Sequence, residues 1–506
     1  MAEQLFKKIL VANRSEIAVR VMNACRTLGI PCVAVYSEAD ANSRHRWYAD
    51  ESVLIGPPPP RESYLDIDKI IDAAHKTGCD AIHPGYGFLA ENPLLPRRCA
   101  AEKITFVGPD AEAMRLLGNK IESRVKMAEA GVPLIPGMTG SATEAKVFHD
   151  AARKAGYPVI IKAAAGGGGK GMRVVHKPDE LDDALEAAQR EAANAFGDDT
   201  VYLEKYISNP RHVEFQVLAD MHGKCAHLFE RECSIQRRHQ KIIEETPSTA
   251  VSPELRARMG ADAVKVAQAA HYTNAGTVEF LLDDSGHYYF LEMNTRIQVE
   301  HPITEMVTGV DLVVEQIRVA AGLSLSDSLK NLTQRGHAIE CRIYAEDGEN
   351  GFLPSTGKII HYTEPAGPGI RVDSGIEQGS EITINYDPIM AKLIVHAPNR
   401  DMAITKMIGA LHQYKILGVK TSKRFMVDVL SHLEFRAGRT FTSFIEQHMG
   451  SRSVDDKKYR DAAAAAVIAA MQSAALNGNA GGPGRAAMAT PWQSLGAWQI
   501  GDSIRG

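Results

Sequence analysis

The stretch "HYYFLEMNTRIQVEHP", residues 287–302, joins an apolar strand pattern to a row of polar side chains. Strand alternation places residues 289, 291 and 293 on one face and the even-numbered residues on the other. The even-numbered face carries Phe290, Glu292 and Asn294 and then, at the same spacing, Arg296, Gln298 and Glu300. We therefore expect one strand and its extension to present two acids, two amides and a guanidinium together. A solvated strand face is the alternative interpretation.

A second acid is predicted to lie opposite this stretch. The segment "GTVEFLLDDSGHYYFLEMN", residues 276–294, is typical of a hairpin that turns at residues 284–286, which brings Glu279 close to residues 290–292. Two ionised carboxylates about 4 Å apart repel by roughly 4 kcal/mol at an effective dielectric of about 20. One is therefore protonated, the two point apart, or a divalent cation lies between them. Oxygen ligands from Glu279, Glu292 and Asn294 favour Mg²⁺ or Mn²⁺. A pair of surface acids on a solvated face is the alternative.

A glycine-rich loop, "AAAGGGGKGM", lies upstream at residues 163–172. The strand patterns "VIIKAAA" and "MRVVHK" flank it, whereas a Rossmann site requires a helix after the loop, and the spacing does not fit a Walker A loop. Glycine destabilises regular structure, so the loop is expected to be a mobile flap over phosphates, with Lys162 and Lys120 as the cations on phosphate oxygens. The run of four glycines is Gly166, Gly167, Gly168 and Gly169. An ordinary flexible surface loop is the alternative.

Composition excludes several classes of protein. The chain has 506 residues, a formal net charge of −5 and seven scattered cysteines with no CxxC pair. The charge gives no indication of a nucleic-acid surface or a polybasic membrane patch. Unpaired cysteines indicate reduced thiols, and the N-terminus lacks the apolar core of a signal peptide. No apolar run approaches membrane length. We expect a cytoplasmic enzyme with no nucleic-acid or membrane partner.

The secondary-structure pattern divides the chain into four parts. Strand and helix patterns alternate over residues 1–115, which predicts an open α/β sheet. Residues 116–330 contain helices, the glycine loop (flap about 132–205) and then strands around one long helix. Residues 331–447 contain short strands and two helical stretches. Residues 448–506 form an Ala-rich helix, a Gly/Pro linker and a tail that holds Trp492 and Trp498, two of the three tryptophans.

Several stretches together resemble the biotin carboxylase component of biotin-dependent carboxylases, an ATP-grasp family. They are "ILVANRSEIAVRV", "AIHPGYGFLAEN", "VIIKAAAGGGGKGMR", "YLEKYISNPRHVEFQVLAD", "RECSIQRRHQKIIEE", "GTVEFL", "FLEMNTRIQVEHPITEMVTGVDLV" and "RGHAIECRIYAED", and they extend through nearly all of residues 1–447. The resemblance implies an α/β and α+β fold. Its parts are an N-terminal open α/β domain, an ATP-grasp domain with a mobile glycine-flap subdomain and a β-rich C-terminal domain.

The resemblance also implies residue roles. ATP contacts are implied for Lys120, Lys162, the four loop glycines, Glu204, the backbone of Lys205 and Ile207, His212, Gln236 and His239. The metal ligands are Glu279, Glu292 and Asn294. Bicarbonate is bound by Lys241, Arg296, Gln298 and the Val299 backbone, Glu300 is the base, and Arg342 faces the ureido oxygen of biotin. The implied reaction forms carboxyphosphate and ADP from bicarbonate and ATP, and then carboxylates N1′ of biotin.

The biotin is expected on another chain. Related carboxylases often carry it on a Met-Lys-Met lysine in a small β domain, whereas Lys406 lies here in the helical pattern "DMAITKMIGALH" and no such domain follows. We therefore expect two partners, a separate biotin carboxyl carrier protein and a carboxyltransferase subunit. Asn23 stands where stand-alone bacterial homodimers place an arginine, so either a homodimer or a larger hetero-oligomer is expected.

The predicted function is the first half-reaction of an acyl-CoA carboxylase. The alternatives are the biotin carboxylase subunit of a two-subunit pyruvate carboxylase and another ATP-grasp ligase that joins a carboxylate to an amine. The intact set of Lys241, Arg296, Glu300 and Arg342 argues against a third interpretation, a non-catalytic ATP-binding scaffold. The tail, residues 490–506, is expected to dock onto another subunit, because tryptophan is enriched at binding hot spots. Folding back on its own domain and disorder are the alternatives.

Overall fold

The computed structural model describes residues 5–138, 140, 142, 144–164, 172–238, 240–348 and 350–450. They belong to one compact unit, Met1–Gly450. The predicted loop glycines Gly166–Gly169, the predicted ligand His239 and the tail from Ser451 onward lie outside the described residues. Within the described part of the chain, no helix is long and apolar enough to cross a membrane.

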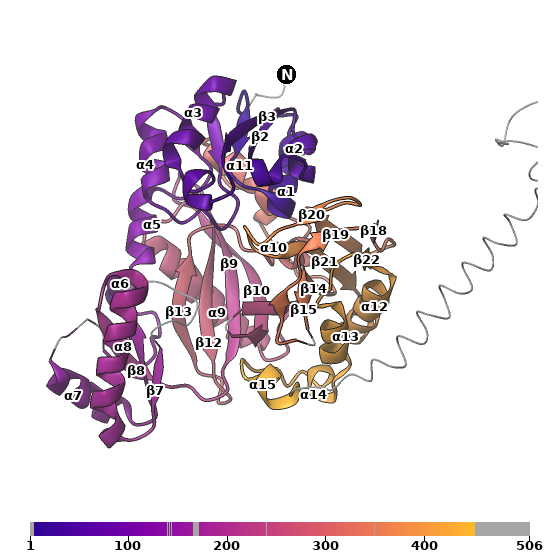
Figure 1. Cartoon of the computed structure of the whole chain (residues 1–506). Helices are drawn as coiled ribbons and strands as arrows, with labels where there is room; N and C mark the ends of the chain where they lie inside the picture. The colour runs from indigo at the N-terminus through magenta and orange to yellow at the C-terminus, as the bar shows by residue number, and fades with distance from the viewer. Residues whose placement is uncertain are drawn as a thin grey trace, which may run out of the picture. The chain divides into compact units, whose positions relative to one another are not determined.

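The N-terminal part is drawn in indigo in Figure 1. It is built on a five-stranded parallel sheet of order β3-β2-β1-β4-β5. Its strands are β1 (Ile9–Val11), β2 (Cys32–Ser37), β3 (Glu51–Gly56), β4 (Ala81–His83) and β5 (Thr105–Phe106). The helices between them are α1 (Ser15–Thr27), α2 (Arg44–Tyr48), α3 (Ile67–Thr77) and α4 (Leu94–Ala101). Alternate residues of β1 enter two different cores, because both faces of a parallel sheet are covered. The predicted open α/β sheet is confirmed.

A smaller three-stranded antiparallel sheet follows two helices, α5 (Ala111–Gly118) and α6 (Lys120–Glu129). Its strands are β6 (Val159–Ala163), β7 (Arg173–Val175) and β8 (Val201–Lys205), and α7 (Ala145–Ala155) and α8 (Leu181–Phe196) pack against it around Phe148, Ile161 and Leu203. The prediction that strands flank the glycine loop on both sides is confirmed, since β6 and β7 pair with each other.

The largest sheet has eight antiparallel strands in the order β13-β12-β9-β10-β11-β14-β21-β19. They are β9 (Arg211–Ala219), β10 (Cys225–Arg237), β11 (Gln240–Thr246), β12 (Asn274–Leu282), β13 (Tyr288–Asn294), β14 (His337–Tyr344), β19 (Ile370–Ser374) and β21 (Ile389–Ala397). Three helices accompany it: α9 (Pro253–Ala269), α10 (His301–Thr308) and α11 (Leu312–Ala320). The pairing of β11 with β14 places strands from the predicted parts 116–330 and 331–447 in one sheet.

The C-terminal segment adds four helices where two helical stretches were predicted: α12 (Arg400–Gln413), α13 (Lys423–Ser431), α14 (Leu433–Arg436) and α15 (Phe444–His448). Its short strands are β15 (Glu346–Asp347), β16 (Leu353–Pro354), β17 (Gly357–Lys358), β18 (His361–Thr363), β20 (Glu381–Ile382) and β22 (Lys415–Leu417). Lys406 lies in α12 as predicted, and its ammonium donates to the carbonyl oxygens of Pro368 and His396.

Two predictions about residues 287–302 are wrong. A β-bulge interrupts the hairpin, so that Phe290 pairs with Phe280 while Glu292 pairs with Glu279. Phe290 and Glu292 therefore point to opposite faces, and Phe290 shares its core with Met293. Beyond Asn294 there is no strand extension, and Glu300 is instead the residue that precedes α10. A turn of the chain, not alternation, brings the polar residues together.

Candidate active site

The ammonium of Lys241 is the centre of a buried group of carboxylates. From β11 it donates to Glu214 of β9 (2.5 Å), Glu279 of β12 (2.8 Å) and Glu300 at the start of α10 (2.7 Å). Burial alone would lower the pKa of Lys241, but the three acids outweigh it and raise that pKa well above its usual range. Lys241 is therefore a permanent cation, and it binds acids from three different parts of the fold.

Glu300 is fully buried and bound by two cations. Its second oxygen accepts a hydrogen bond from Arg342 of β14 (3.0 Å), and the Arg342 Nε donates to Glu244 of β11 (2.6 Å). Burial would raise the pKa of Glu300, but Lys241, Arg342 and Arg231 outweigh it and hold that pKa well below its usual range. A carboxylate held so strongly in the ionised form accepts a proton readily only after these cations have been redistributed.

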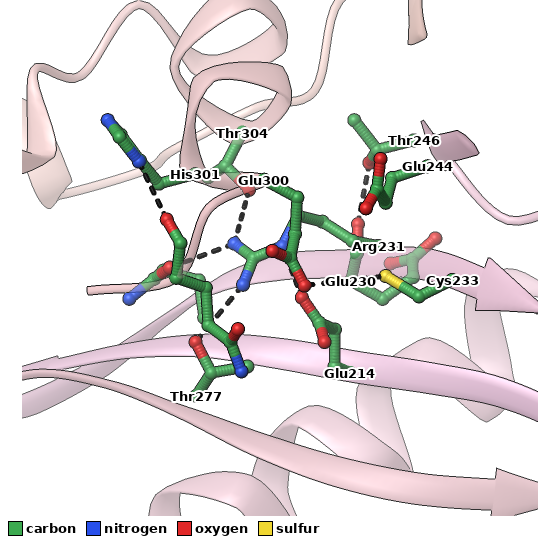
Figure 2. Close-up of polar contacts among 12 residues, drawn as sticks. Glu214, Glu230, Arg231, Cys233, Glu244, Thr246, Thr277, Glu300, His301 and Thr304 are labelled. Carbon is green, nitrogen blue, oxygen red and sulfur yellow. Dashed lines mark hydrogen bonds and ion pairs between the residues drawn. The ribbon is translucent and has the colours of Figure 1, made fainter. Parts of the chain in front are cut away.

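Arg231 of β10 joins this group through Glu214 and has no exposed surface. Its guanidinium donates to Glu214 (2.6 Å), Gln216 (2.8 Å), Thr277 (3.0 Å) and Thr304 (3.0 Å). Figure 2 shows the guanidinium between Thr304 and Thr277. Because Glu214 also binds Lys241 and α10 begins after Glu300, Arg231 fixes the positions of both acids.

The predicted carboxylate pair is confirmed, since Glu279 and Glu292 are opposite each other in the β12–β13 ladder. Burial would raise the pKa of Glu279, but Lys241 and His212, whose Nε2 lies 3.0 Å away, lower it. Burial and the charge of Glu279 raise the pKa of Glu292. Lys120 is 3.9 Å from Glu292, whose side chain is 39% exposed. The pair thus offers one strongly ionised and one accessible carboxylate.

This oxygen donor set fits a divalent cation of the Mg²⁺ type. Asn294 lies beside it, with its amide nitrogen donating to Glu279 (2.9 Å) and its amide oxygen accepting from Arg296 (3.3 Å). Two other groups of potential ligands, His212–Glu214–Glu279 and Glu214–Cys233–Glu300, also occur in the described part of the chain. Lys241 forms ion pairs with every acid in both groups, whereas in the pair Glu279–Glu292 it contacts only Glu279, so this pair fits a cation better.

The predicted anion-binding residues border the same group. Arg296 forms an ion pair with Glu91 (2.9 Å), and Gln298 donates to Glu279 (3.1 Å). The carbonyl oxygen of Val299 accepts a hydrogen bond from the buried Lys392 of β21 (3.0 Å). A turn of backbone therefore holds a guanidinium and an amide beside Glu300.

The predicted nucleotide-binding residues form a second group near the small sheet. Lys162 of β6 and Glu204 of β8 form a direct ion pair, and Arg124 also donates to Glu204 (3.0 Å). The Lys205 N–H donates to the carbonyl of Pro136 (2.7 Å), and Ile207 follows β8 in a loop. Gln236 of β10 reaches the other group, where its amide nitrogen lies 2.9 Å from His212 Nδ1.

Four residues that hold the site together were not predicted from the sequence: Arg231, Glu214, Glu244 and Lys392. Two of them could have been recognised from the sequence, because each is a charged residue in a largely apolar strand. Glu214 lies two residues after His212 on a strand that is otherwise largely apolar, and Lys392 is the one cation in the apolar strand "IMAKLIVHA". A lone charge in a buried strand indicates a paired internal group. Arg231 and Glu244 lie in polar segments, where no such contrast marks them.

Three family models match the chain. They are described as the biotin carboxylase N-terminal domain (residues 5–114), the carbamoyl-phosphate synthase L chain ATP-binding domain (119–328) and the biotin carboxylase C-terminal domain (340–447).

Named relatives match most of the chain. A pyruvate carboxylase subunit of Methanothermobacter thermautotrophicus is 55% identical over 444 residues, which cover 88% of this chain and 90% of that protein. The alpha subunit of methylcrotonoyl-CoA carboxylase from Rattus norvegicus is 49% identical over 87% of this chain, which spans 62% of that longer protein. The solved structure of the biotin carboxylase domain dimer of Hydrogenobacter thermophilus 2-oxoglutarate carboxylase, in complex with MgADP, ADP and bicarbonate, is 47% identical. It aligns with a TM-score of 0.85 over 90% of this chain and all of that one.

Proposed function

Because the chain belongs to the biotin carboxylase family, we propose that the cluster of Lys241, Glu300 and Arg342 is its catalytic centre. The chain is an ATP-dependent ligase that uses bicarbonate to carboxylate biotin. The observation that carries the assignment of the centre is the single carboxylate of Glu300, which lies between Lys241 (2.7 Å) and Arg342 (3.0 Å). Each of the two cations can leave Glu300 to bind a different substrate.

Binding of the substrates redistributes these cations. Lys241 and Arg296 bind the bicarbonate anion, with the guanidinium fork of Arg296 matching its planar shape. Gln298 and the Val299 backbone complete the anion site. Arg342 turns toward the ureido oxygen of biotin, where a fixed positive charge stabilises the negative charge that develops. As both cations leave Glu300, its proton affinity rises and it accepts the proton of bicarbonate.

Deprotonated bicarbonate then attacks the γ-phosphorus of ATP, which gives carboxyphosphate and ADP. Carboxyphosphate breaks into CO₂ and phosphate in a site that excludes water. The phosphate takes the N1′ proton of biotin, and N1′ attacks CO₂. Glu300 is fully buried and Lys241 nearly so, which supports a water-excluding site.

The nucleotide is bound by two groups of residues. One group contacts ATP and consists of Lys120, Lys162, His212, Gln236, His239 and the glycines Gly166–Gly169. The other lies at the adenine end of ATP and consists of Glu204 and the backbone of Lys205 and Ile207. Glu279, Glu292 and Asn294 hold Mg²⁺ or Mn²⁺. When bound, the metal neutralises phosphate charge. The ion pair between Lys162 and Glu204 supports a site that is already shaped before ATP enters.

A simple assay tests this function against another ATP-grasp ligase. The purified chain should cleave ATP only when bicarbonate is present, and free biotin should stimulate the cleavage and become carboxylated. A carboxylate–amine ligase would need neither bicarbonate nor biotin. Bicarbonate-independent ATP cleavage without carboxybiotin would contradict the assignment.

The final acceptor is the second part of the proposal. We place the chain in an acyl-CoA carboxylase, where a separate carrier protein brings biotin and a carboxyltransferase subunit uses it. The 49% identity to the methylcrotonoyl-CoA carboxylase protein supports this choice. The 55% identity to the pyruvate carboxylase protein favours pyruvate as a second candidate. Carboxyl transfer to acyl-CoA or to pyruvate by the complex that co-purifies with the chain distinguishes them. We expect a homodimer or a larger hetero-oligomer.

We further propose that the functional domains are residues 1–115, 116–330 and 331–447, followed by the segment 448–506. The ranges of the three family models support these boundaries. Limited proteolysis that cuts first near residue 448 and leaves residues 1–447 intact would agree with them.

A further inference from the structure

Glu340, in the middle of β14, is a fully buried acid for which the described part of the chain offers no hydrogen-bond partner. Neither of its oxygens has a hydrogen bond within the described residues. Glu244 of β11 lies directly opposite it in the strand ladder. Glu244 uses one oxygen to accept from Arg342 Nε (2.6 Å), and its other oxygen has no partner either. Residues opposite each other in an antiparallel ladder have Cβ atoms about 4.5–5.5 Å apart. The two carboxyl groups are therefore close enough to form a hydrogen bond when one of them is protonated.

The cations nearby are already matched by other acids. Arg342 binds Glu244 and Glu300. Lys392, opposite Arg342 in the β14–β21 ladder, lies 3.2 Å from Glu16 and 3.7 Å from Asp373. Each of these cations therefore has two closer acids.

The charged groups that face Glu340 have opposing effects on its ionisation. They are Lys392 of β21, Glu244 of β11, Arg342 of its own strand and Glu300 at the start of α10. Burial raises the pKa of Glu340 well above its usual range, Lys392 and Arg342 oppose this, and the two acids add to it. Burial also raises the pKa of Glu244, to about 7. A buried carboxylate with neither a cation nor a donor is far more costly than a neutral acid.

We propose that Glu340 is a neutral carboxylic acid that keeps Glu244 ionised, and that it thereby acts as a positioning residue for Arg342. If Glu340 were ionised instead, its charge would drive a proton onto Glu244. Arg342 Nε would then lose its carboxylate acceptor, and Glu300 alone would hold the guanidinium. With Glu340 neutral, the fork of Arg342 is fixed between Glu244 and Glu300, in the orientation from which it reaches biotin. This inference rests on the proposed role of Arg342.

Two isosteric variants of the full chain, Glu340→Gln and Glu244→Gln, test the inference. Glutamine imitates a neutral Glu340, so carboxylation of free biotin by Glu340→Gln should stay within about threefold of the wild type at neutral pH. Glu244→Gln removes the acceptor of Arg342 and should raise KM for biotin by about tenfold or more, with a smaller effect on bicarbonate-dependent ATP cleavage.

Difference infrared spectroscopy tests the protonation of Glu340 without any assay of activity. The carbonyl absorption of a protonated carboxyl group should be present in the wild type at neutral pH and missing from Glu340→Gln. Loss of a carboxylate absorption instead would overturn the inference, as would failure of Glu340→Gln to fold or a tenfold loss of its activity. A wild-type chain that lacks biotin carboxylation but shows the absorption would overturn the proposed function while leaving Glu340 a neutral acid.

Discussion

Substitution of Glu300 by glutamine separates catalysis from structure at the proposed centre. The amide keeps the shape of the side chain but cannot accept the bicarbonate proton. A general base contributes about 10²–10⁴ in rate, so bicarbonate-dependent ATP cleavage should fall by that factor, which is about 2.7–5.4 kcal/mol of transition-state stabilisation. ATP affinity should stay close to that of the wild type, because Lys162 and Glu204 of the nucleotide group do not contact Glu300.

The fold should survive this substitution with reduced stability. Lys241 keeps Glu214 and Glu279, and Arg342 keeps Glu244. Each lost charged hydrogen bond is worth about 1.5–3 kcal/mol, so the melting temperature should fall.

The pH dependence of the stability loss follows from the lowered pKa of Glu300. The ionised group stabilises the fold at every pH above the ordinary carboxyl pKa of about 4.3, and this contribution is lost as pH falls through the lowered pKa. The melting-temperature difference between the two proteins should therefore be constant at neutral pH and narrow in acid.

A matched control is available on α10, the helix that Glu300 precedes. Glu305 of α10 is also buried and accepts from two arginines, Arg20 (2.7 Å) and Arg371 (2.7 Å), neither of which is assigned to a substrate. Glu305→Gln should lower the melting temperature by a similar amount but leave turnover nearly unchanged. Steady-state kinetics, calorimetry of ATP binding and thermal melts of both variants provide the comparison. Wild-type turnover of Glu300→Gln, or an equal loss of turnover in the control, would refute the reasoning.

Four other substitutions or deletions test the remaining assignments. Lys162→Ala should weaken ATP binding without changing the fold, and calorimetry that shows an unchanged affinity would contradict its phosphate contact. Arg342→Ser should abolish carboxybiotin formation while part of the bicarbonate-dependent ATP cleavage remains, and equal loss of both would argue against its role on biotin. Arg231→Met should lower the melting temperature strongly, because removal of a buried ion partner costs about 3–5 kcal/mol; a melt like that of the wild type would exclude its role as a support. Deletion of residues 451–506 should preserve carboxylation of free biotin but reduce co-purification of the partner protein, and unchanged assembly would show that the tail is not a docking element.

Local sequence patterns were sufficient to predict the N-terminal sheet and the proximity of the two acids. Alternating strand and helix patterns, each closed by a short turn, leave few other folds for residues 1–115. The hairpin turn predicted that Glu279 lies near residues 290–292. The structure places it opposite Glu292, next to the bulge. In both cases the contacts join residues that are close in sequence.

The errors have a common physical origin in packing between distant segments. The bulge beside Glu292 allows both Phe290 and Met293 to enter one core, which strict alternation forbids. The position of Glu300 depends on where α10 begins and on Arg231, which binds Thr304 of that helix. The contact of Arg342 with Glu244 joins residues 98 positions apart. Periodicity carries no information about such contacts.

The central claim is that Glu300 prepares bicarbonate to attack ATP directly. Bicarbonate labelled with ¹⁸O tests it, because the attacking oxygen stays on phosphorus when carboxyphosphate breaks down. The account predicts that inorganic phosphate released by the wild-type chain carries one labelled oxygen from bicarbonate, and that Glu300→Gln releases labelled phosphate at a rate about 10²–10⁴ lower. Unlabelled phosphate from the wild type, released while biotin is carboxylated, would contradict it.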